Sequence, residues 1–312
     1  MSEEECSVLS IQSTVVYGYV GNKSATFPLQ VLGFDVSPIN SVQFSNHTGY
    51  GKVKGQVLDS NDIGALYEGL KQNNLLKYSH VLTGYIGSKS FLEKVGEMVR
   101  DIKAKSPSVK YVCDPVMGDH GKMVGLNGKI INKDRMYVPQ ELLPVYRDVI
   151  IPLADIITPN QFELELLTEV SIRSIEDCVK AIDILHERGV VTVVLSSSLL
   201  GNDGHLLCIA SSVLGKKKES YKVEMPYLPA TFSGTGDLFA ATLLAWVHKD
   251  KNLKTAIEKT VSTLQAVIKR TLDHATSLAG QEKPTTHQLE LRLIQSKKDI
   301  ENPDILYKAL DV

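Results

Sequence analysis

Strand-like apolar runs alternate with helical segments along the first two thirds of the chain, and this alternation limits the possible folds more than any other feature. The strand-like runs lie at 8–12, 36–44, 81–82, 110–113, 155–158 and 190–195. The helical segments lie at 23–32, within 56–73, and at 89–105, 161–168 and 174–189. Ser60 or Asn61 is the candidate cap of the helix within 56–73. Parallel strands need a crossover connection, usually a helix, and that crossover is right-handed. The alternation therefore predicts an α/β fold with a central, mainly parallel β-sheet flanked by helices.

The last third of the chain follows a different pattern. Residues 205–211 and 221–225 are expected to pair as an antiparallel ribbon joined by a lysine-rich turn, and long helices are expected at 236–249 and 253–278. Neither an internal repeat nor a Pro- or Ser-rich linker interrupts the sequence. The chain 1–312 is therefore predicted to form one domain.

Residues 118–139 break the alternation, with glycines at 118, 121, 125 and 128, several lysines and little apolar periodicity. A loop of this length inside a compact domain is more often a functional loop than a plain connection. We therefore predict a lid loop over a binding site at about 118–139. A disordered insertion is the alternative.

Composition and charge exclude several classes of partner. The net charge of −2 offers no electrostatic attraction for nucleic acid or for an anionic membrane. The acidic start is not followed by the apolar stretch of a signal peptide, and the most apolar stretch, 238–247, is about half as long as a membrane span. The four cysteines form no Cys-x-x-Cys pair, so neither a zinc site nor a disulfide framework is indicated. The chain is expected in the cytosol, without nucleic acid or membrane partners.

Polar residues follow the predicted parallel strands, where α/β proteins bind their ligands. In chain order they are Ser13, Asn46-His47-Thr48, Thr83-Gly84-Tyr85, Asp114, Thr158-Pro159-Asn160 with Glu163, and Ser196-Ser197-Ser198. Each of them alone suits a turn or a helix cap. Their concentration at one edge of the predicted sheet favours a ligand site there.

The sequence Ser233-Gly234-Thr235-Gly236-Asp237 stands before a predicted apolar helix. Glycines let successive backbone N–H groups converge, and the positive end of the helix dipole adds attraction for an anion. The turn therefore suits a transferring phosphoryl group beside the Asp237 carboxylate, which is expected to be a weak base because the helix end stabilises its ionised form. An ordinary acidic residue in a first helical turn is the alternative. The sequence contains neither a P-loop motif nor a dinucleotide-binding glycine motif.

Two carboxylates, Asp114 and Asp119, stand near the start of the predicted lid. Carboxylate, water and phosphate oxygens form the usual octahedral environment of Mg²⁺. A capping turn followed by an exposed aspartate explains the same two residues without a metal. Glu163, three residues after Asn160, could likewise face the site or complete a capping box.

Several blocks of the sequence resemble the pyridoxal kinases of the ribokinase-like superfamily, almost from end to end. The blocks are Ser10-Ile11-Gln12-Ser13, Gly18-Tyr19-Val20-Gly21-Asn22, Val42-Gln43-Phe44-Ser45-Asn46-His47-Thr48-Gly49-Tyr50, 82–85, 114–119, 158–163, 234–240 and 288–292. The Gly-Thr-Gly-Asp sequence at 234–237 is shared by the whole superfamily. The Ser-Asn-His-Thr-Gly-Tyr sequence at 45–50 is much narrower and indicates the pyridoxal kinases.

The resemblance implies a ribokinase-like fold with a lid over the active site, and a homodimer. It implies transfer of the ATP γ-phosphate to the 5′-hydroxymethyl group of pyridoxal, pyridoxine or pyridoxamine, with pyridoxal 5′-phosphate as the product from pyridoxal. Mg²⁺ or another divalent cation, and a monovalent cation (K⁺ or Na⁺), are implied as well. The alternatives are a hydroxymethylpyrimidine kinase, in which Cys replaces Asp237 and the 45–50 block is missing, and a non-catalytic B6-binding protein, against which the presence of Asp237 and Asp119 argues.

Individual residues acquire roles from the same resemblance. Asp237 matches the catalytic proton acceptor, and the anion hole is matched by Gly234, Thr235 and Gly236. The substrate-binding positions are matched by Ser13, Thr48, Val20, Phe44, Tyr85 and Asp237. The ATP-binding positions are matched by Asp114, Asn160, Ser196, Ser197, Leu228, Pro229, Ala230 and Thr235. Asp119 matches a Mg²⁺ position, and the monovalent-cation positions are matched by Asp114, Thr158 and Glu163.

The chain departs from the family pattern at a few positions. Ser196 replaces an expected threonine but keeps the hydroxyl, so the consequence should be small. The segment between Asp119 and Met136 is longer than in the animal enzymes, which affects the closed geometry of the lid rather than the chemistry. Thr14 and Tyr17, near the expected mouth of the substrate site, also differ.

Overall fold

A computed structural model describes residues 6–124, 130–202, 204–215 and 217–312, and of residues 120–124 and 130–135 it describes the backbone alone. Within this part of the chain, one sheet contains ten strands in the order β12-β11-β10-β9-β8-β5-β4-β1-β2-β3. The strands are β1 (Ser7–Val15), β2 (Asp35–Phe44), β3 (Gly55–Val57), β4 (His80–Thr83), β5 (Lys110–Cys113), β8 (Ile156–Ile157), β9 (Thr192–Ser198), β10 (His205–Leu214), β11 (Lys217–Pro226) and β12 (Leu310–Asp311). Strands β1, β2, β4, β5, β8 and β9 are parallel, which confirms the predicted α/β fold.

Antiparallel strands form both edges of the sheet. At one edge β10 pairs with β9 and β11, and β12 pairs with β11; at the other edge β3 pairs with β2. The predicted ribbon is confirmed, but β10 and β11 are longer than predicted, and β11 includes Lys217 and Lys218, which were expected in the turn. Strands β3 and β12 were not predicted, because two or three residues are too few to show an apolar alternation.

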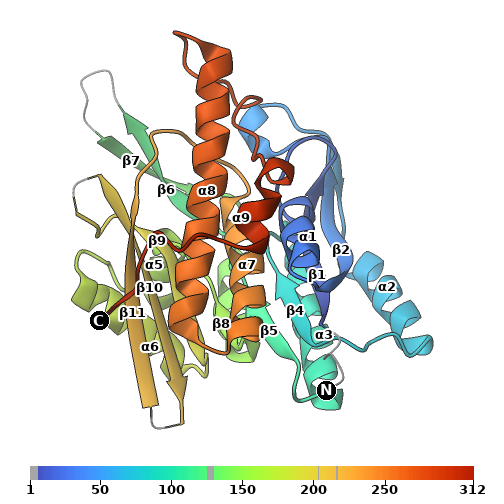
Figure 1. Cartoon of the computed structure of the whole chain (residues 1–312). Helices are drawn as coiled ribbons and strands as arrows, with labels where there is room; N and C mark the ends of the chain where they lie inside the picture. The colour runs from blue at the N-terminus through green and yellow to red at the C-terminus, as the bar shows by residue number, and fades with distance from the viewer. Residues whose placement is uncertain (1–5, 125–129, 203, 216) are drawn as a thin grey trace.

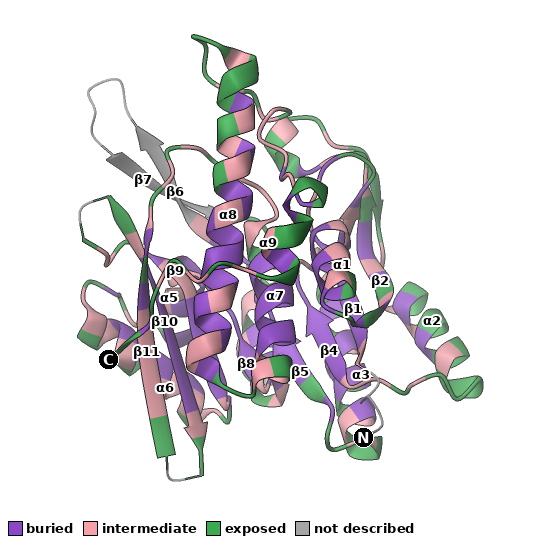
Figure 2. Cartoon of the chain, viewed as in Figure 1, coloured by how far each residue is buried: buried purple, intermediate pink, exposed green. Residues whose placement is uncertain are grey.

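Helices cover both faces of the sheet and enclose two hydrophobic cores (Figures 1 and 2). One core is covered by α1 (Asn22–Val31), α7 (Thr235–Asp250), α8 (Leu253–Ala279) and α9 (Lys297–Glu301). The other is covered by α2 (Ser60–Gln72), α3 (Lys89–Lys105), α4 (Leu142–Val145), α5 (Gln161–Thr168) and α6 (Ile175–Glu187). Successive side chains of a strand point to opposite faces of the sheet, so Val81 and Leu82 of β4 pack in different cores. Among the helices of the described segments, none is both long and apolar enough to span a bilayer.

Side chains at the helix starts explain several of the observed boundaries. Ser88 and Ser174 accept hydrogen bonds from backbone N–H groups in the first turns of α3 and α6. Such caps satisfy N–H groups that have no partner inside the helix. The cap of α2 is Asp59 rather than the predicted Ser60 or Asn61, because the Asp59 carboxylate accepts from two first-turn N–H groups.

Segment 118–139 contains an antiparallel ribbon instead of the predicted loop. Strand β6 (Gly118–Val124) pairs with β7 (Ile130–Met136). The prediction of an irregular loop is therefore wrong for these strands, and its residues 125–129 lie outside the described residues. Backbone groups form the ladder of such a ribbon, so a stretch of glycines and lysines gives little sequence signal for it. Figure 1 shows the ribbon beyond the end of the sheet at which the parallel strands finish.

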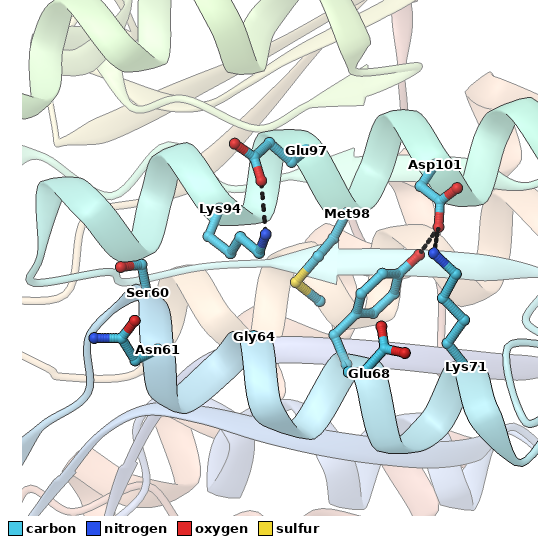
Figure 3. Close-up of a pocket in the computed structure, with 10 residues that line it drawn as sticks. Ser60, Asn61, Gly64, Glu68, Lys71, Lys94, Glu97, Met98 and Asp101 are labelled. Atoms are coloured by element: carbon cyan, nitrogen blue, oxygen red, sulfur yellow. Dashed lines mark hydrogen bonds and ion pairs between the residues drawn. The ribbon is translucent and has the colours of Figure 1, made fainter.

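A groove of about 500 Å³ lies between α2 and α3 (Figure 3). Several of its polar side chains contact one another: Tyr67 donates to Asp101 at 2.7 Å, and Lys94 lies 2.8 Å from Glu97. None of the residues predicted to bind a ligand lines this groove. The chemistry must therefore be sought elsewhere, at the ends of the parallel strands.

Candidate active site

The predicted polar residues gather where the parallel strands end. Thr48, Tyr85 and Asp114 follow β2, β4 and β5, and Thr158 follows β8. Ser196 was expected just after its strand but lies inside β9, because β9 continues to Ser198 while pairing with β10. These residues therefore share one edge of the sheet, as the alternation predicted.

Ser13 lies inside β1, at an irregularity in the pairing with β2. Gln12 is opposite Asn40, but Thr14 is opposite Gln43, so the register shifts across Ser13. A bulge of this kind bends a strand and redirects a side chain, and bulges are frequent beside functional sites. Ser13 thus occupies a special position that the sequence pattern, which ended this strand at residue 12, did not indicate.

The glycine turn before α7 packs tightly against the loop that follows β1. Gly234 has a φ of 81°, and a Cβ atom placed on it would lie 1.9 Å from the carbonyl oxygen of Tyr19. Ser24 of α1 donates a hydrogen bond to the Gly234 carbonyl at 2.8 Å. Gly234 is also the N-cap residue of α7 and has no side chain to cap it, so the first-turn N–H groups remain for a ligand. A Cβ on Gly236 would lie 3.3 Å from Asp114 Oδ2, so this turn also faces Asp114.

Asp237 connects the glycine turn with the loop that follows β1. Its Oδ2 accepts a hydrogen bond from Gly21 N–H at 2.7 Å. Gly21 in turn rests on Ser13, since a Cβ at Gly21 would lie 2.0 Å from the Ser13 carbonyl oxygen. Asp237 is half-buried rather than turned into the core. The carboxylate therefore stands between the glycine turn and the end of β1.

The pKa of Asp237 is shifted in the direction opposite to our prediction. Burial raises it from 3.8 to about 6, although the Gly21 N–H bond opposes the shift. The prediction of a weak base, made from the helix end alone, is wrong because the loss of water around the carboxylate outweighs the amide and the helix terminus. A carboxylate with a pKa near 6 is a better proton acceptor at neutral pH than an exposed one.

Asp114, which faces the glycine turn, and Thr158, at the end of the neighbouring strand β8, carry oxygen atoms without a partner among the described residues. Both residues are buried, and neither Asp114 Oδ2 nor Thr158 Oγ1 makes a hydrogen bond with any residue that the structure describes. Burial, with the nearby charges of Glu163 and Asp237, raises the pKa of Asp114 well above its ordinary value. Burying a polar atom without a partner is costly, so these two oxygen atoms are suited to bind a ligand.

Glu163 completes the capping box that we considered as an alternative to a site role. Asn160 caps α5 by accepting from Glu163 N–H, and Glu163 accepts from Asn160 N–H at 2.9 Å. Its other carboxylate oxygen accepts from Met117 N–H at 2.9 Å, which attaches the start of α5 to the chain after β5. Burial raises its pKa to about 7 against the effect of these amides. Glu163 thus shapes the site and also adds to its negative charge.

The residues predicted to surround a substrate ring come from three strand ends. Val20, Phe44 and Tyr85 are half-buried, and Thr48 is exposed in the short 3-10 turn Thr48–Tyr50. The hydroxyl of Ser41 in β2 donates to the Tyr85 carbonyl at 2.6 Å and so fixes the chain after β4. Val20 is next to Gly21, which holds Asp237, so the predicted ring pocket and the carboxylate are parts of one arrangement.

The predicted ATP and Mg²⁺ positions lie toward the other half of the sheet. Asn160 donates to the Gly118 carbonyl at 2.8 Å, and Ser196 donates to the Pro159 carbonyl at 3.3 Å. Ser197 is half-buried in β9, and Leu228, Pro229 and Ala230 follow β11. Asp119 in β6 accepts a hydrogen bond from the hydroxyl of Tyr137. The structure thus brings these residues to the same edge of the sheet as Asp237.

Sequence reasoning gave no role to Gly21 or Glu290, which both prove to be central contacts. Gly21 has a φ of 54° and no room for a side chain, and its N–H holds Asp237. The Glu290 carboxylate accepts from Tyr19 N–H at 3.0 Å and from the Tyr50 hydroxyl at 2.7 Å. Both residues stand in blocks that resemble the family, but no local pattern shows which distant residue they contact.

Comparisons with known proteins show the family of this chain. The family model described as phosphomethylpyrimidine kinase matches residues 36–284. Human pyridoxal kinase is 51% identical over 98% of this chain and 99% of its own length, and the Arabidopsis thaliana pyridoxal kinase is 52% identical over 97% and 93%. The structure of Leishmania donovani pyridoxal kinase in complex with ADP and pyridoxamine is 35% identical and has a TM-score of 0.88, covering 98% of this chain and 99% of that chain. This chain therefore belongs to the pyridoxal kinase family, within the family described as phosphomethylpyrimidine kinase.

Proposed function

We propose that this chain uses ATP to phosphorylate the 5′-hydroxymethyl group of pyridoxal and forms pyridoxal 5′-phosphate, the activity that the names of its relatives indicate. Pyridoxine and pyridoxamine carry the same hydroxymethyl group and are expected to be substrates as well. The observation that carries the proposal is the Gly21–Asp237 hydrogen bond of 2.7 Å, because it places a carboxylate between the phosphate-binding turn and the end of β1.

Each part of the site has one task in the proposed mechanism. The substrate ring is held by Ser13 and Thr48, in a pocket formed by Val20, Phe44 and Tyr85. Asp237 accepts the proton of the hydroxymethyl group while the oxygen of that group attacks the γ-phosphorus of ATP in line, the bond between the γ-phosphorus and the bridging oxygen breaks, and ADP leaves. The N–H groups of Gly234, Thr235 and Gly236 hold the migrating phosphoryl group. Phosphoryl transfer has a loose transition state, so positioning and charge stabilisation by these groups supply most of the acceleration.

The family model leaves hydroxymethylpyrimidine as a second candidate substrate, because its printed description is phosphomethylpyrimidine kinase. The pyridoxal kinases match nearly the whole chain, and this favours pyridoxal. A coupled assay with ATP and either alcohol decides between them. Rapid turnover of pyridoxal supports the proposal. Turnover of hydroxymethylpyrimidine alone refutes it, and binding of pyridoxal without turnover supports a non-catalytic B6-binding protein instead.

The residues at the site fit the cations that the family implies. Asp114 Oδ2 and Thr158 Oγ1 are buried oxygens without a partner among the described residues, and oxygen donors of this kind suit K⁺ or Na⁺. Three or more His, Cys, Asp or Glu side chains do not gather as a metal site anywhere in the described segments. A monovalent cation would be held by Asp114, Thr158 and Glu163, the positions that the resemblance to the family implies. A divalent cation, Mg²⁺ or a substitute, would be held by Asp119 and the ATP phosphates, where it would neutralise phosphate charge.

K⁺ is expected to raise the melting temperature of the unaltered chain, since a ligand that binds only the folded state stabilises it. Thr158→Val should abolish this K⁺ effect, because valine keeps the shape of threonine and removes the oxygen. The measurement compares KCl with tetramethylammonium chloride at equal ionic strength. Thr260→Val is the matched control, since Thr260 is also buried with an unpaired hydroxyl among the described residues but lies in α8. An equal K⁺ effect in all three proteins would contradict the assignment.

The kcat/KM for pyridoxal is expected to fall as the pH is lowered through about 6. Asp237 must be ionised to accept a proton, and burial raises its pKa to about 6, so acidification removes the acceptor. Burial also raises the pKa of Glu163, to about 7, which is close to that of Asp237. The apparent pKa of the rate profile therefore belongs to the cluster of acids rather than to Asp237 alone. The pH profile of Asp237→Asn separates this limb from the titration of the substrate itself. An identical acid limb in that variant would argue against Asp237.

Four further expectations belong to the same proposal. The β6–β7 ribbon is proposed to act as the lid, because Tyr137, just after β7, connects it to the substrate residue Tyr85. The Tyr137 hydroxyl donates to Asp119 of β6, and the Tyr137 carbonyl accepts from the Tyr85 hydroxyl at 3.5 Å. Such a lid would exclude water and so prevent hydrolysis of ATP. The single kinase domain 1–312 and the cytosolic location are predictions from the sequence pattern, and the homodimer rests on the likeness to the family. Size-exclusion chromatography with light scattering tests the homodimer.

A further inference from the structure

The largely buried carboxylate of Glu290, outside the glycine turn at 233–237, connects segments that are far apart in the sequence. Glu290 follows α8, and its side chain is 11% exposed. It accepts hydrogen bonds from Tyr19 N–H at 3.0 Å and from the Tyr50 hydroxyl at 2.7 Å, and it lies 3.2 Å from His47 Nε2. The fit leaves no free space, since a Cβ on Gly18 would lie 2.4 Å from Glu290 Oε1. These contacts of the carboxylate go to two loops at the substrate edge.

Both loops carry residues of the proposed alcohol site. The loop at 18–21 contains Val20 and Gly21, and Gly21 N–H holds the Asp237 carboxylate. The second loop contains Thr48, in the 3-10 turn that His47 caps. A shift of Glu290 would therefore move the substrate pocket and the hydrogen bond to Asp237 together.

His47 extends the connection from Glu290 to the glycine turn at 233–237, called the phosphate turn below because it is proposed to bind the migrating phosphoryl group. Its Nδ1 accepts from Gly49 N–H at 3.1 Å and lies 3.3 Å from the Ser233 hydroxyl. Nε2, on the other side of the ring, faces Glu290, so one imidazole links the carboxylate to the residue before Gly234.

The carboxylate is suited to be ionised in this position. Burial alone would raise the pKa of Glu290, but hydrogen bonds from His47, Tyr50 and the Tyr19 amide outweigh burial, so the pKa lies below its ordinary value. Hydrogen bonds to an ionised acceptor are about twice as strong as those between neutral groups. The negative charge therefore contributes to the stiffness of both loops.

We infer that Glu290 is a positioning residue for the alcohol substrate, holding the 18–21 and 45–50 loops against the phosphate turn. The inference rests on the proposed phosphorylation of pyridoxal. It assigns to that site a residue that acts through Tyr19, Tyr50 and His47.

The proposed ATP residues Asn160, Ser196 and Leu228 lie on or after β8, β9 and β11, and make none of these contacts. Thr235, which also matches an ATP position, lies in the glycine turn next to Ser233, whereas both loops held by Glu290 carry residues of the alcohol site. Glu290 should therefore affect the KM for pyridoxal much more than the KM for ATP.

The test is Glu290→Gln, which keeps the size of the side chain and removes its charge. We expect the KM for pyridoxal to rise about tenfold, the effect of weakening a charge-assisted network, while the KM for ATP changes much less. Glu282→Gln, an exposed acid of the same segment, is the control and should change neither value. A merely structural role would lower the active fraction, and hence kcat, and would leave both KM values alone. An unchanged KM for pyridoxal, or an equal rise in both KM values, overturns the inference.

A second variant keeps the test decisive if Glu290→Gln does not fold. Tyr50→Phe removes one donor to the same carboxylate, and the KM for pyridoxal should rise about threefold, the effect of losing one hydrogen bond; an unchanged value overturns the inference. Calorimetric titration with pyridoxal alone reports binding without turnover. If the unaltered chain binds pyridoxal but does not phosphorylate it, the proposed function fails, whereas weaker binding by both variants still supports the role of Glu290.

Discussion

Asp237→Asn is expected to lower kcat for pyridoxal by about 10²–10⁴-fold and to leave pyridoxal binding intact. The asparagine side chain has the same shape, and its amide oxygen can still accept from Gly21 N–H, which lies 2.7 Å from Asp237 Oδ2. It cannot accept the proton of the hydroxymethyl group. Steady-state kinetics measure kcat, and calorimetric titration measures the Kd for pyridoxal.

Asp250→Asn is the matched control for this variant. Asp250 is the last residue of α7, whose first turn contains Asp237, and it pairs with Lys259 at 2.7 Å. It should retain normal kcat, and near-normal turnover in Asp237→Asn would refute the assignment. Folding raises the Asp237 pKa from 3.8 to about 6, so the ionised carboxylate opposes folding at pH 7. The neutral asparagine lacks this cost, and the melting temperature of Asp237→Asn at pH 7 should not fall.

Gly234→Ala is expected to lower kcat/KM for both substrates by at least about 10²-fold, the effect of losing one donor that stabilises the transition state. A new Cβ would lie 1.9 Å from the Tyr19 carbonyl oxygen, so the turn would have to move away from the loop at 18–21. The φ of 81° adds strain for any residue other than glycine. Displacement of the turn separates its N–H groups from Asp237 and from the phosphate. Initial-rate kinetics with each substrate varied in turn measure the loss.

Gly33→Ala separates backbone strain from displacement of the turn. Gly33 has a similar φ of 89°, but a Cβ there meets no atom within 4 Å. This control should lose stability and keep its kcat/KM. If Gly33→Ala and Gly234→Ala lose activity equally, strain explains the effect, and the close contact with Tyr19 does not position the turn.

Elements with strong local signals were predicted well. Helices 89–105 and 161–168 and strand 110–113 have the predicted bounds, because apolar periodicity and capping residues act within each segment. The ribbon at 118–139 was missed, since the pairing of β6 with β7 joins backbones with no apolar alternation. The bulge at Ser13 depends on the register with β2, which no single segment determines.

The site was predicted in its location but not in its internal contacts. Strand ends and the glycine turn indicated the correct edge of the sheet, because that rule depends only on chain order. The Gly21–Asp237 and Glu290–Tyr19 hydrogen bonds join residues more than two hundred positions apart. The pKa of Asp237 was predicted with the wrong sign, since its burial follows from the packing of the 18–21 loop.

The most direct test of the central claim is a single-turnover measurement of phosphoryl transfer from ATP to pyridoxal by Asp237→Asn, with protein in excess over ATP. If Asp237 accepts the proton beside the phosphate turn, the transfer step itself slows by the factor seen in kcat, with pyridoxal bound normally. Transfer as fast as in the unaltered chain, with a low kcat caused by slow product release, would contradict the account.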